Sequence, residues 1–280
     1  MKYVILGAGA AGITAARTLR KGKKEDSIRI ISTDDRVHSR CMLHKYLSHE
    51  RDEKELNFVP EDFFCENNIE WMPGCTVVEL DTSSQKLVLD NGQQISYDKL
   101  LIATGAESFI PPVGKLREAS NVFGLRHLRD ARAIDKKAEV SSEIAIIGSG
   151  LVGLDAACGL MEQGKQVTVI EMADQILPIQ LDEKGAKEYQ KRVENAGCRF
   201  FLGRKAQDTL CNEKGEVTRL LLDNGEEIPC DMVIVAAGVR PGTAGMDGEG
   251  IRIDRGIQVN EYLQTDVPDI YAAGDVTGLS

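Results

Sequence analysis

Two glycine-rich turns carry the spacing that binds a pyrophosphate. The first contains Gly7, Gly9 and Gly12 after the apolar run YVIL, and the second contains Gly148, Gly150 and Gly153 after IAII. Between a strand and a helix, such glycines allow a tight turn, close approach of the phosphates and packing of the helix on the strand. The phosphates then lie at the positive helix N-terminus. Two copies predict either two bound nucleotides or a flavin together with a nicotinamide.

The two copies differ at the position after the second strand, where an acidic residue would bind the ribose. Glu171 follows the strand 167–170, where its carboxylate can accept hydrogen bonds from both ribose hydroxyls and repel a 2′-phosphate. We therefore expect NADH over NADPH, because residues 172–175 contain no Arg or Lys to reverse that choice. In the first copy Ser32 stands at the equivalent position. One of the two following aspartates is expected to reach the ribose there, and Asp34 is the candidate.

A third element favours the flavin and nicotinamide interpretation. The strand 269–273 delivers Gly274 and Asp275. A carboxylate at a strand end can hold a ribityl hydroxyl or, through water, a flavin pyrophosphate, whereas taken alone the same stretch is typical of a β-turn.

The elements around these motifs occur twice along the chain in the same order. Each strand, glycine turn and helix is followed by a hairpin with an Asp-Asn-Gly turn, at 90–92 and at 223–225, which runs into a buried strand. Strands alternating with helices imply parallel sheets, so we predict an α/β fold of two Rossmann-like domains, each with an antiparallel β-hairpin extension. The Pro-rich stretches near 111 and 241 place the second domain at 113–241, inserted into a first domain formed by 1–112 and 242–280.

Composition excludes several function classes. A formal net charge of −10 disfavours nucleic acid, and no apolar run approaches the length of a membrane span. The glycines near the N-terminus argue against a signal peptide. Seven cysteines without a C-x-x-C pair indicate neither a disulfide framework nor a metal site, so we expect no bound metal and a reducing, cytoplasmic location.

With these motifs in order, nearly the whole chain resembles the pyridine nucleotide–disulfide oxidoreductases, flavoproteins with two dinucleotide-binding folds. The resemblance implies FAD in the first domain and NADH in the second. Its motifs would place the cofactors on the following residues: Gly7, Gly9, Ala10, Ala11, Gly12, Asp34, Arg40, Ala103, Thr104, Gly105, Gly274 and Asp275 for FAD, and Gly148, Gly150, Leu151, Val152, Gly153, Glu171 and Gly238 for NADH.

Within the family, SRCMLHKYL from Ser39 is most similar to the branch of NADH-dependent rubredoxin and ferredoxin reductases and nitrite reductase flavin domains. There an Arg, matched by Arg40, precedes a Lys on a helix beside the flavin. Lys45 matches that Lys, and Asp155 stands where the family usually has Glu. The resemblance implies an ion pair between Lys45 and Asp155 at the flavin.

Cys41 points to a sister branch, because it replaces the Pro usual at its position. It coincides with the single redox cysteine of NADH peroxidases, NADH oxidases and coenzyme A disulfide reductases. On a continuous helix, Cys41 and Lys45 would share the polar face, and the surrounding cations would favour a thiolate. Cys41 is thus either a redox group or a small residue near the cofactor. Tyr46 stands where a second cysteine would be needed for a dithiol relay.

The leading hypothesis is an FAD-dependent NADH oxidoreductase that passes electrons to a small rubredoxin- or ferredoxin-like protein. The first alternative passes them through Cys41 to a small-molecule oxidant. The second is a non-catalytic nucleotide-binding fragment or sensor, because the resemblance implies an interface domain beyond the Gly-Asp element, which we expect this chain to lack. That domain implies a homodimer for a full-length form.

Overall fold

The computed structural model describes residues 1–248 and 250–278, which divide into two compact units. Unit 1 is formed by Met1–Ser39, Asn57–Glu107 and Val239–Ser280, and unit 2 by Arg40–Leu56 and Ser108–Gly238. Expectations for Leu279 and Ser280 lie outside the described residues.

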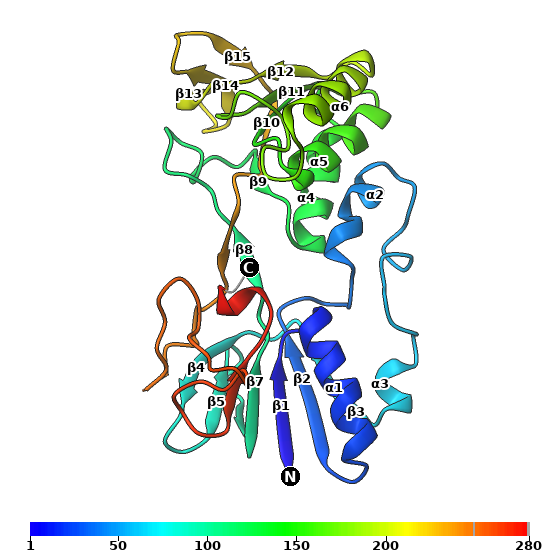
Figure 1. Cartoon of the computed structure of the whole chain (residues 1–280), viewed down its shortest axis with the longest axis vertical. Coiled ribbons are helices and arrows are strands. Elements are labelled where there is room, and N and C mark those ends of the chain that lie inside the picture. The colour runs from blue at the N-terminus through cyan, green and yellow to red at the C-terminus, as the bar shows by residue number, and fades with distance from the viewer. Residues whose placement is uncertain (249, 279–280) are drawn as a thin grey trace. The chain divides into compact units, whose positions relative to one another are not determined.

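Unit 1 is built on a parallel sheet in the order β18-β7-β1-β2-β3 (Figure 1). Its strands are β1 (Lys2–Leu6), β2 (Ser27–Ser32), β3 (Ile69–Pro73), β7 (Lys99–Ile102) and β18 (Ile270–Ala272). The helices α1 (Ala10–Gly22) and α3 (Phe63–Glu66) pack on one face of this sheet. Ile13 of α1 and Phe63 of α3 form a core cluster there with buried side chains of β1 and β2. A 3-10 turn covers Asp275–Thr277.

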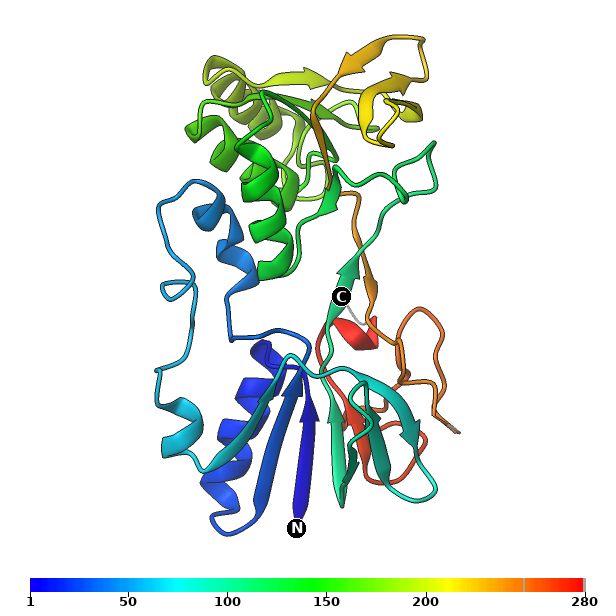
Figure 2. The same cartoon turned by 180° about the vertical axis from the view of Figure 1, so that it is seen from behind.

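The other face of this sheet is covered by an antiparallel sheet, visible from behind in Figure 2. Its strands are β4 (Val77–Asp81), β5 (Lys86–Leu89) and β6 (Gln94–Ser96). The turn between β5 and β6 contains Gly92 at a φ of +81°, which glycine adopts without steric cost. The hairpin predicted at 90–92 is therefore present. Two short strands, β8 (Ala106–Ser108) and β17 (Val239–Pro241), pair with each other.

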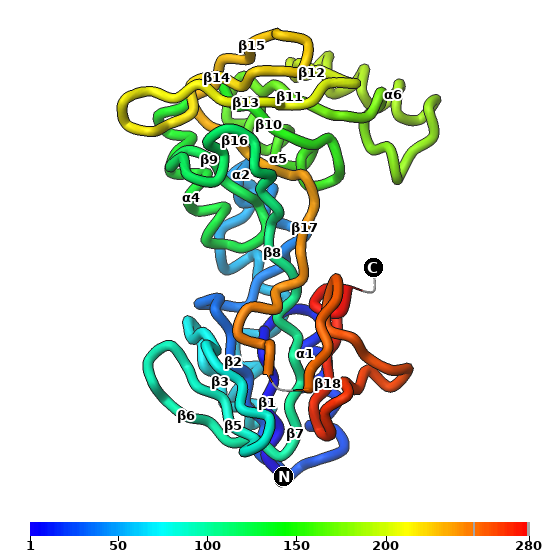
Figure 3. Tube along the Cα trace, turned by 90° about the vertical axis from the view of Figure 1, so that its left-hand side faces the viewer, coloured from blue at the N-terminus to red at the C-terminus, as the bar shows by residue number. Residues whose placement is uncertain are grey.

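Unit 2 repeats this plan, as the trace in Figure 3 shows. Its parallel sheet has the order β12-β11-β10-β16-β9, and its antiparallel sheet the order β13-β14-β15. The parallel strands are β9 (Val122–Gly124), β10 (Glu143–Ile147), β11 (Gln166–Ile170), β12 (Arg199–Phe201) and β16 (Met232–Val235). The antiparallel strands are β13 (Ala206–Cys211), β14 (Val217–Leu222) and β15 (Glu227–Pro229), with Gly225 in the second predicted turn.

The helices α4 (Leu128–Ala138), α5 (Leu151–Glu162) and α6 (Glu183–Asn195) lie on the face of the parallel sheet away from the hairpin strands. The short helix α2 (Leu43–Leu47), preceded by a 3-10 turn at Arg40–Met42, packs on α4 and α5. Leu43 and Leu47 join the core formed by α4, α5 and β10. The segment Arg40–Leu56 thus belongs to unit 2, whereas the sequence-based boundaries place it within residues 1–112.

Three kinds of contact attach this segment to α4 and α5. Gly159 of α5 lets the chain approach so closely that a Cβ would lie 2.8 Å from the carbonyl oxygen of His44. The Arg132 guanidinium donates two hydrogen bonds of 2.7 Å to Glu53. Gln163 donates to the carbonyl oxygen of Leu47. Apolar burial, a close backbone contact at Gly159 and polar contacts therefore fix the segment on unit 2.

Among the described residues, the structure contains no helix with both the length and the apolar character needed to cross a bilayer.

Candidate nucleotide-binding sites

The first glycine turn closes against the end of β7. Gly7 has a φ of +104°, and a Cβ on it would overlap the carbonyl oxygen of Ala103. A Cβ on Gly12 would overlap the carbonyl oxygen of Gly7. Because side chains cannot be accommodated there, the turn presents bare backbone, as close approach of a pyrophosphate requires.

The N-terminus of α1 opens directly from this turn. Gly9 is its N-cap residue and has no side chain to occupy the first amide groups. Those amides lack intrahelical partners and carry the positive end of the helix dipole. Gly9, Ala10 and Ala11 therefore fit a dinucleotide phosphate.

Two later motifs lie beside the first turn. Gly274 follows β18 with a φ of +81°, and a Cβ on it would lie 3.3 Å from the Cβ of Ala11. Ala103 faces Gly7, and Thr104 Oγ1 donates a 2.7 Å hydrogen bond to the carbonyl oxygen of Gly242. The carboxyl ends of β1, β7 and β18 thus bring together the Gly7 turn, Ala103–Gly105 and the exposed Asp275.

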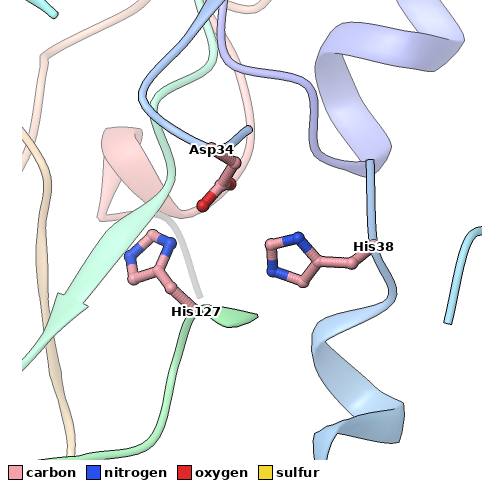
Figure 4. Close-up of side chains that lie close together, drawn as sticks. All are labelled: Asp34, His38 and His127. Carbon is pink, nitrogen blue, oxygen red and sulfur yellow. The ribbon is translucent and has the colours of Figure 1, made fainter. Parts of the chain in front are cut away.

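Asp34 follows β2, next to the strand that carries this turn. Its amide donates to Ser32 Oγ at 3.1 Å, and its carbonyl oxygen accepts from the amide of Gly74 at 3.2 Å. Its carboxylate and the His38 ring offer ligand atoms within 4.8 Å of one another (Figure 4). Asp34 thus lies two residues beyond the end of β2, the region in which dinucleotide-binding folds place an acidic residue for the ribose. His127, also drawn in Figure 4, comes from unit 2.

The second glycine turn has the same construction. Gly148 has a φ of +106°, and a Cβ on it would overlap the carbonyl oxygen of Ala236. Gly150, the N-cap residue of α5, has open space where a Cβ would stand. The neighbouring Leu151 and Val152 are 57% and 45% exposed. Gly238 has a φ of +101° after β16. These positions fit the pyrophosphate of a second dinucleotide.

Glu171 is held at the end of β11 by three hydrogen bonds. Its Oε2 accepts from the Ser149 amide at 2.8 Å and from Ser149 Oγ at 2.9 Å. Its Oε1 accepts from the amide of Ala173 at 2.9 Å. The carboxylate thus stands directly beside the glycine turn, because β10 and β11 are neighbouring parallel strands.

The segment around Cys41 is not the continuous helix expected from the sequence. Cys41 lies in the 3-10 turn at Arg40–Met42, and α2 is only five residues long. The helix ends early because His49 adopts a φ of +60°, after which the chain turns away. Cys41 is exposed, so its thiol is accessible.

The expected ion pair between Lys45 and Asp155 is not formed. Lys45 Nζ pairs with Glu50 at 2.7 Å, while Asp155 lies 3.5 Å from His44 Nδ1. The hydrogen bond from Lys45 raises its pKa and lowers the pKa of Glu50. Asp155 has the shorter of the two acidic side chains, and Glu50 is a nearer partner for the lysine.

Sequence reasoning missed Ser149, the serine inside the second glycine turn. Its side chain is fully buried, and its hydroxyl is committed to Glu171. A residue-by-residue comparison of the two turns would have found it, because the first copy has Ala8 at this position and Ser32 in place of Glu171.

Two parallel sheets, each ending in a bare glycine turn at a helix N-terminus, define a protein with two dinucleotide-binding folds. The chain belongs to the pyridine nucleotide-disulphide oxidoreductase family, whose model matches residues 1–280. Members of this family are oxidoreductases that use FAD and NAD(H).

Named relatives cover almost the whole chain. It is 35% identical over 98% of its length to an NADH oxidase of Methanocaldococcus jannaschii, of which it spans 63%. It is 31% identical to a rubredoxin-NAD(+) reductase of Pseudomonas putida, over 98% of this chain and 71% of the relative. A crystal structure of a ferredoxin reductase from Rhodopseudomonas palustris matches with a TM-score of 0.90 and 30% identity, over 99% of this chain and 68% of that one. The chain thus spans less than two thirds of the archaeal relative.

Proposed function

We propose that the chain is an FAD-dependent NADH oxidoreductase that supplies electrons to a small iron or iron–sulfur protein. The proposal rests mainly on the presence of two bare glycine turns, each with a different acidic residue available to bind the ribose of a nucleotide. Unit 2 offers Glu171 at its turn, and unit 1 offers Asp34 together with the Gly274–Asp275 element. One chain thereby provides a site for a nicotinamide dinucleotide and a site for a flavin dinucleotide.

FAD, when bound, would supply the redox chemistry, since a flavin accepts an electron pair and can release electrons one at a time. The chain's own residues bind and orient the nucleotides. The amides after Gly9 and Gly150 bind the pyrophosphates, and Glu171 accepts hydrogen bonds from ribose hydroxyls.

Lys45 and Asp155 stay the candidates for residues at the flavin, and Arg40 for a cofactor contact. Lys45 Nζ holds its proton throughout the neutral range, because the hydrogen bond to Glu50 raises its pKa. A fixed positive charge of this kind favours an anionic form of a reduced cofactor over a neutral one.

Two relatives support the choice of acceptor. The Pseudomonas protein is named for rubredoxin, and the Rhodopseudomonas structure for ferredoxin. We propose an acceptor of the same class for this chain, and dimerisation of any longer form through a further domain.

A second candidate function rests on Cys41, whose thiol is exposed. In this version the electron pair passes through Cys41 to peroxide, oxygen or a low-molecular-weight disulfide. The similarity to an archaeal NADH oxidase favours it as the alternative.

Turnover by the FAD-loaded chain separates the two candidates. With NADH as donor, the rates of reduction of an artificial dye, of a rubredoxin or ferredoxin, and of hydrogen peroxide are compared for the original chain and Cys41→Ser. We expect Cys41→Ser to retain dye and iron-protein reduction, with Cys65→Ser as the matched control for loss of an exposed thiol. Peroxide or disulfide turnover that disappears only in Cys41→Ser supports the second candidate.

A chain that takes up no added FAD contradicts both candidates. The remaining function would then be binding of a nucleotide without catalysis.

A further inference from the structure

Ser149 and Glu171 form a tethered pair in unit 2. Ser149 is fully buried in the turn between β10 and α5, so its hydroxyl has no access to water as a competing partner. Both its amide and its hydroxyl donate to Glu171 Oε2, at 2.8 Å and 2.9 Å. A charge-assisted bond in a buried position is stronger than a neutral one.

The backbone on both sides of the pair is also fixed. The Glu171 amide donates to Phe201 and its carbonyl oxygen accepts from Arg204, both at 2.9 Å. The carbonyl oxygen of Ser149 accepts from the amide of Leu177 at 3.1 Å. Movement of the Glu171 carboxylate is therefore limited to rotation of its own side chain, and the Ser149 hydroxyl is the side-chain group that opposes this rotation.

We propose that Ser149 is a specificity-determining positioning residue, which holds the Glu171 carboxylate beside the nucleotide ribose and so keeps a 2′-phosphate out. The inference rests on the proposed binding of NADH in unit 2. An untethered glutamate side chain can swing toward solvent and relieve its repulsion of the 2′-phosphate. The tethered carboxylate stays in place, because rotation breaks the bond to the buried hydroxyl and leaves that hydroxyl unpaired.

The first copy of the motif supports this assignment. It has Ala8 in place of Ser149 and Ser32 in place of Glu171, so the hydroxyl tether and the carboxylate are absent together. The serine in the turn occurs in the copy where there is a strand-end carboxylate to hold.

Binding constants for NAD⁺ and NADP⁺, measured by titration calorimetry on the full chain, test the proposal without requiring turnover. Ser149→Ala is expected to lower the preference for NAD⁺ over NADP⁺ about tenfold, chiefly by tighter binding of NADP⁺. The preference is reduced and not abolished, because two backbone donors still hold part of the carboxylate. Ser149→Cys keeps nearly the same volume with a weak donor and should shift the preference in the same direction. Ser149→Thr keeps the hydroxyl and should restore the preference.

The dependence on Glu171 distinguishes positioning from a general structural role. In a Glu171→Gln background, Ser149→Ala is expected to change the preference less than twofold, because the charge it positions is gone. An unchanged preference in Ser149→Ala and Ser149→Cys, or an equal shift in the Glu171→Gln background, contradicts the inference while leaving the proposed function intact. A chain that binds neither nucleotide contradicts the proposed function itself.

Discussion

Gly159 of α5 and His44 of α2 meet backbone to backbone: a Cβ on Gly159 would lie 2.8 Å from the carbonyl oxygen of His44 and 3.3 Å from the Cβ of Leu47. This crossing lets the segment with Cys41 and Lys45 pack on unit 2. The position of both candidate residues therefore depends on a glycine far along the chain.

We predict that Gly159→Ala destabilises unit 2 by about 1–3 kcal/mol, because α2 must move to relieve the overlap. Urea unfolding followed by circular dichroism measures the change. Gly22→Ala is the matched control, since it stands at the end of α1 with no atom near its Cβ position, and it should be neutral or slightly stabilising. Equal stability of the two variants would contradict the close crossing.

The bidentate pair of Arg132 and Glu53 gives a second prediction about the same segment. Glu53→Gln is expected to cost about 1 kcal/mol of unfolding free energy, because the two side chains are largely shielded and make two charge-assisted hydrogen bonds. The control is Glu183→Gln, whose ion pair with Lys187 is exposed and should be worth less than about 0.5 kcal/mol. A larger effect at Glu183 than at Glu53 would show that the pair does not anchor the segment.

The cysteines should divide sharply in reactivity. Burial raises the pKa of the Cys198 and Cys230 thiols to about 12, whereas Cys41, Cys65 and Cys211 are exposed. Iodoacetamide at pH 8 followed by mass spectrometry of peptides should therefore label the exposed three and spare the buried two, since the thiolate is the reactive form. Labelling of Cys198 in the folded chain at a rate equal to that of Cys41 would be inconsistent with the described core.

The same pKa shifts predict that the free energy of unfolding falls as the pH rises into the alkaline range. Thiols in the unfolded chain ionise near pH 9, whereas folded Cys198 and Cys230 ionise near 12. The raised folded pKa contributes stability below pH 9, which is lost progressively as the pH rises toward 12. Urea midpoints at pH 8 and pH 10.5 should therefore fall less in the double variant Cys198→Ala and Cys230→Ala than in the original chain. An identical fall in both proteins would assign the loss to other groups.

The sequence predicts the features that depend on local pattern. The glycine turns, the hairpins with Gly92 and Gly225, and the placement of Glu171 at a strand end all follow from spacing within a few tens of residues. Each requires only that one strand ends, and that the next turn, helix or strand begins, at the stated positions.

Features set by distant residues could not be predicted in this way. The assignment of 40–56 to unit 2 depends on Arg132, Gly159 and Gln163, and α2 is short because of the backbone conformation at His49. Competition between Glu50 and Asp155 for Lys45 is decided by distances that the sequence does not contain.

Anaerobic mixing of the FAD-loaded chain with NADH measures whether the nicotinamide reduces the flavin. We expect rapid bleaching of the oxidised flavin absorbance by one equivalent of NADH and much slower bleaching by NADPH, because Glu171 repels the 2′-phosphate. A flavin spectrum that stays unchanged after addition of excess NADH would contradict the claim that this chain transfers electrons from a nicotinamide to a flavin.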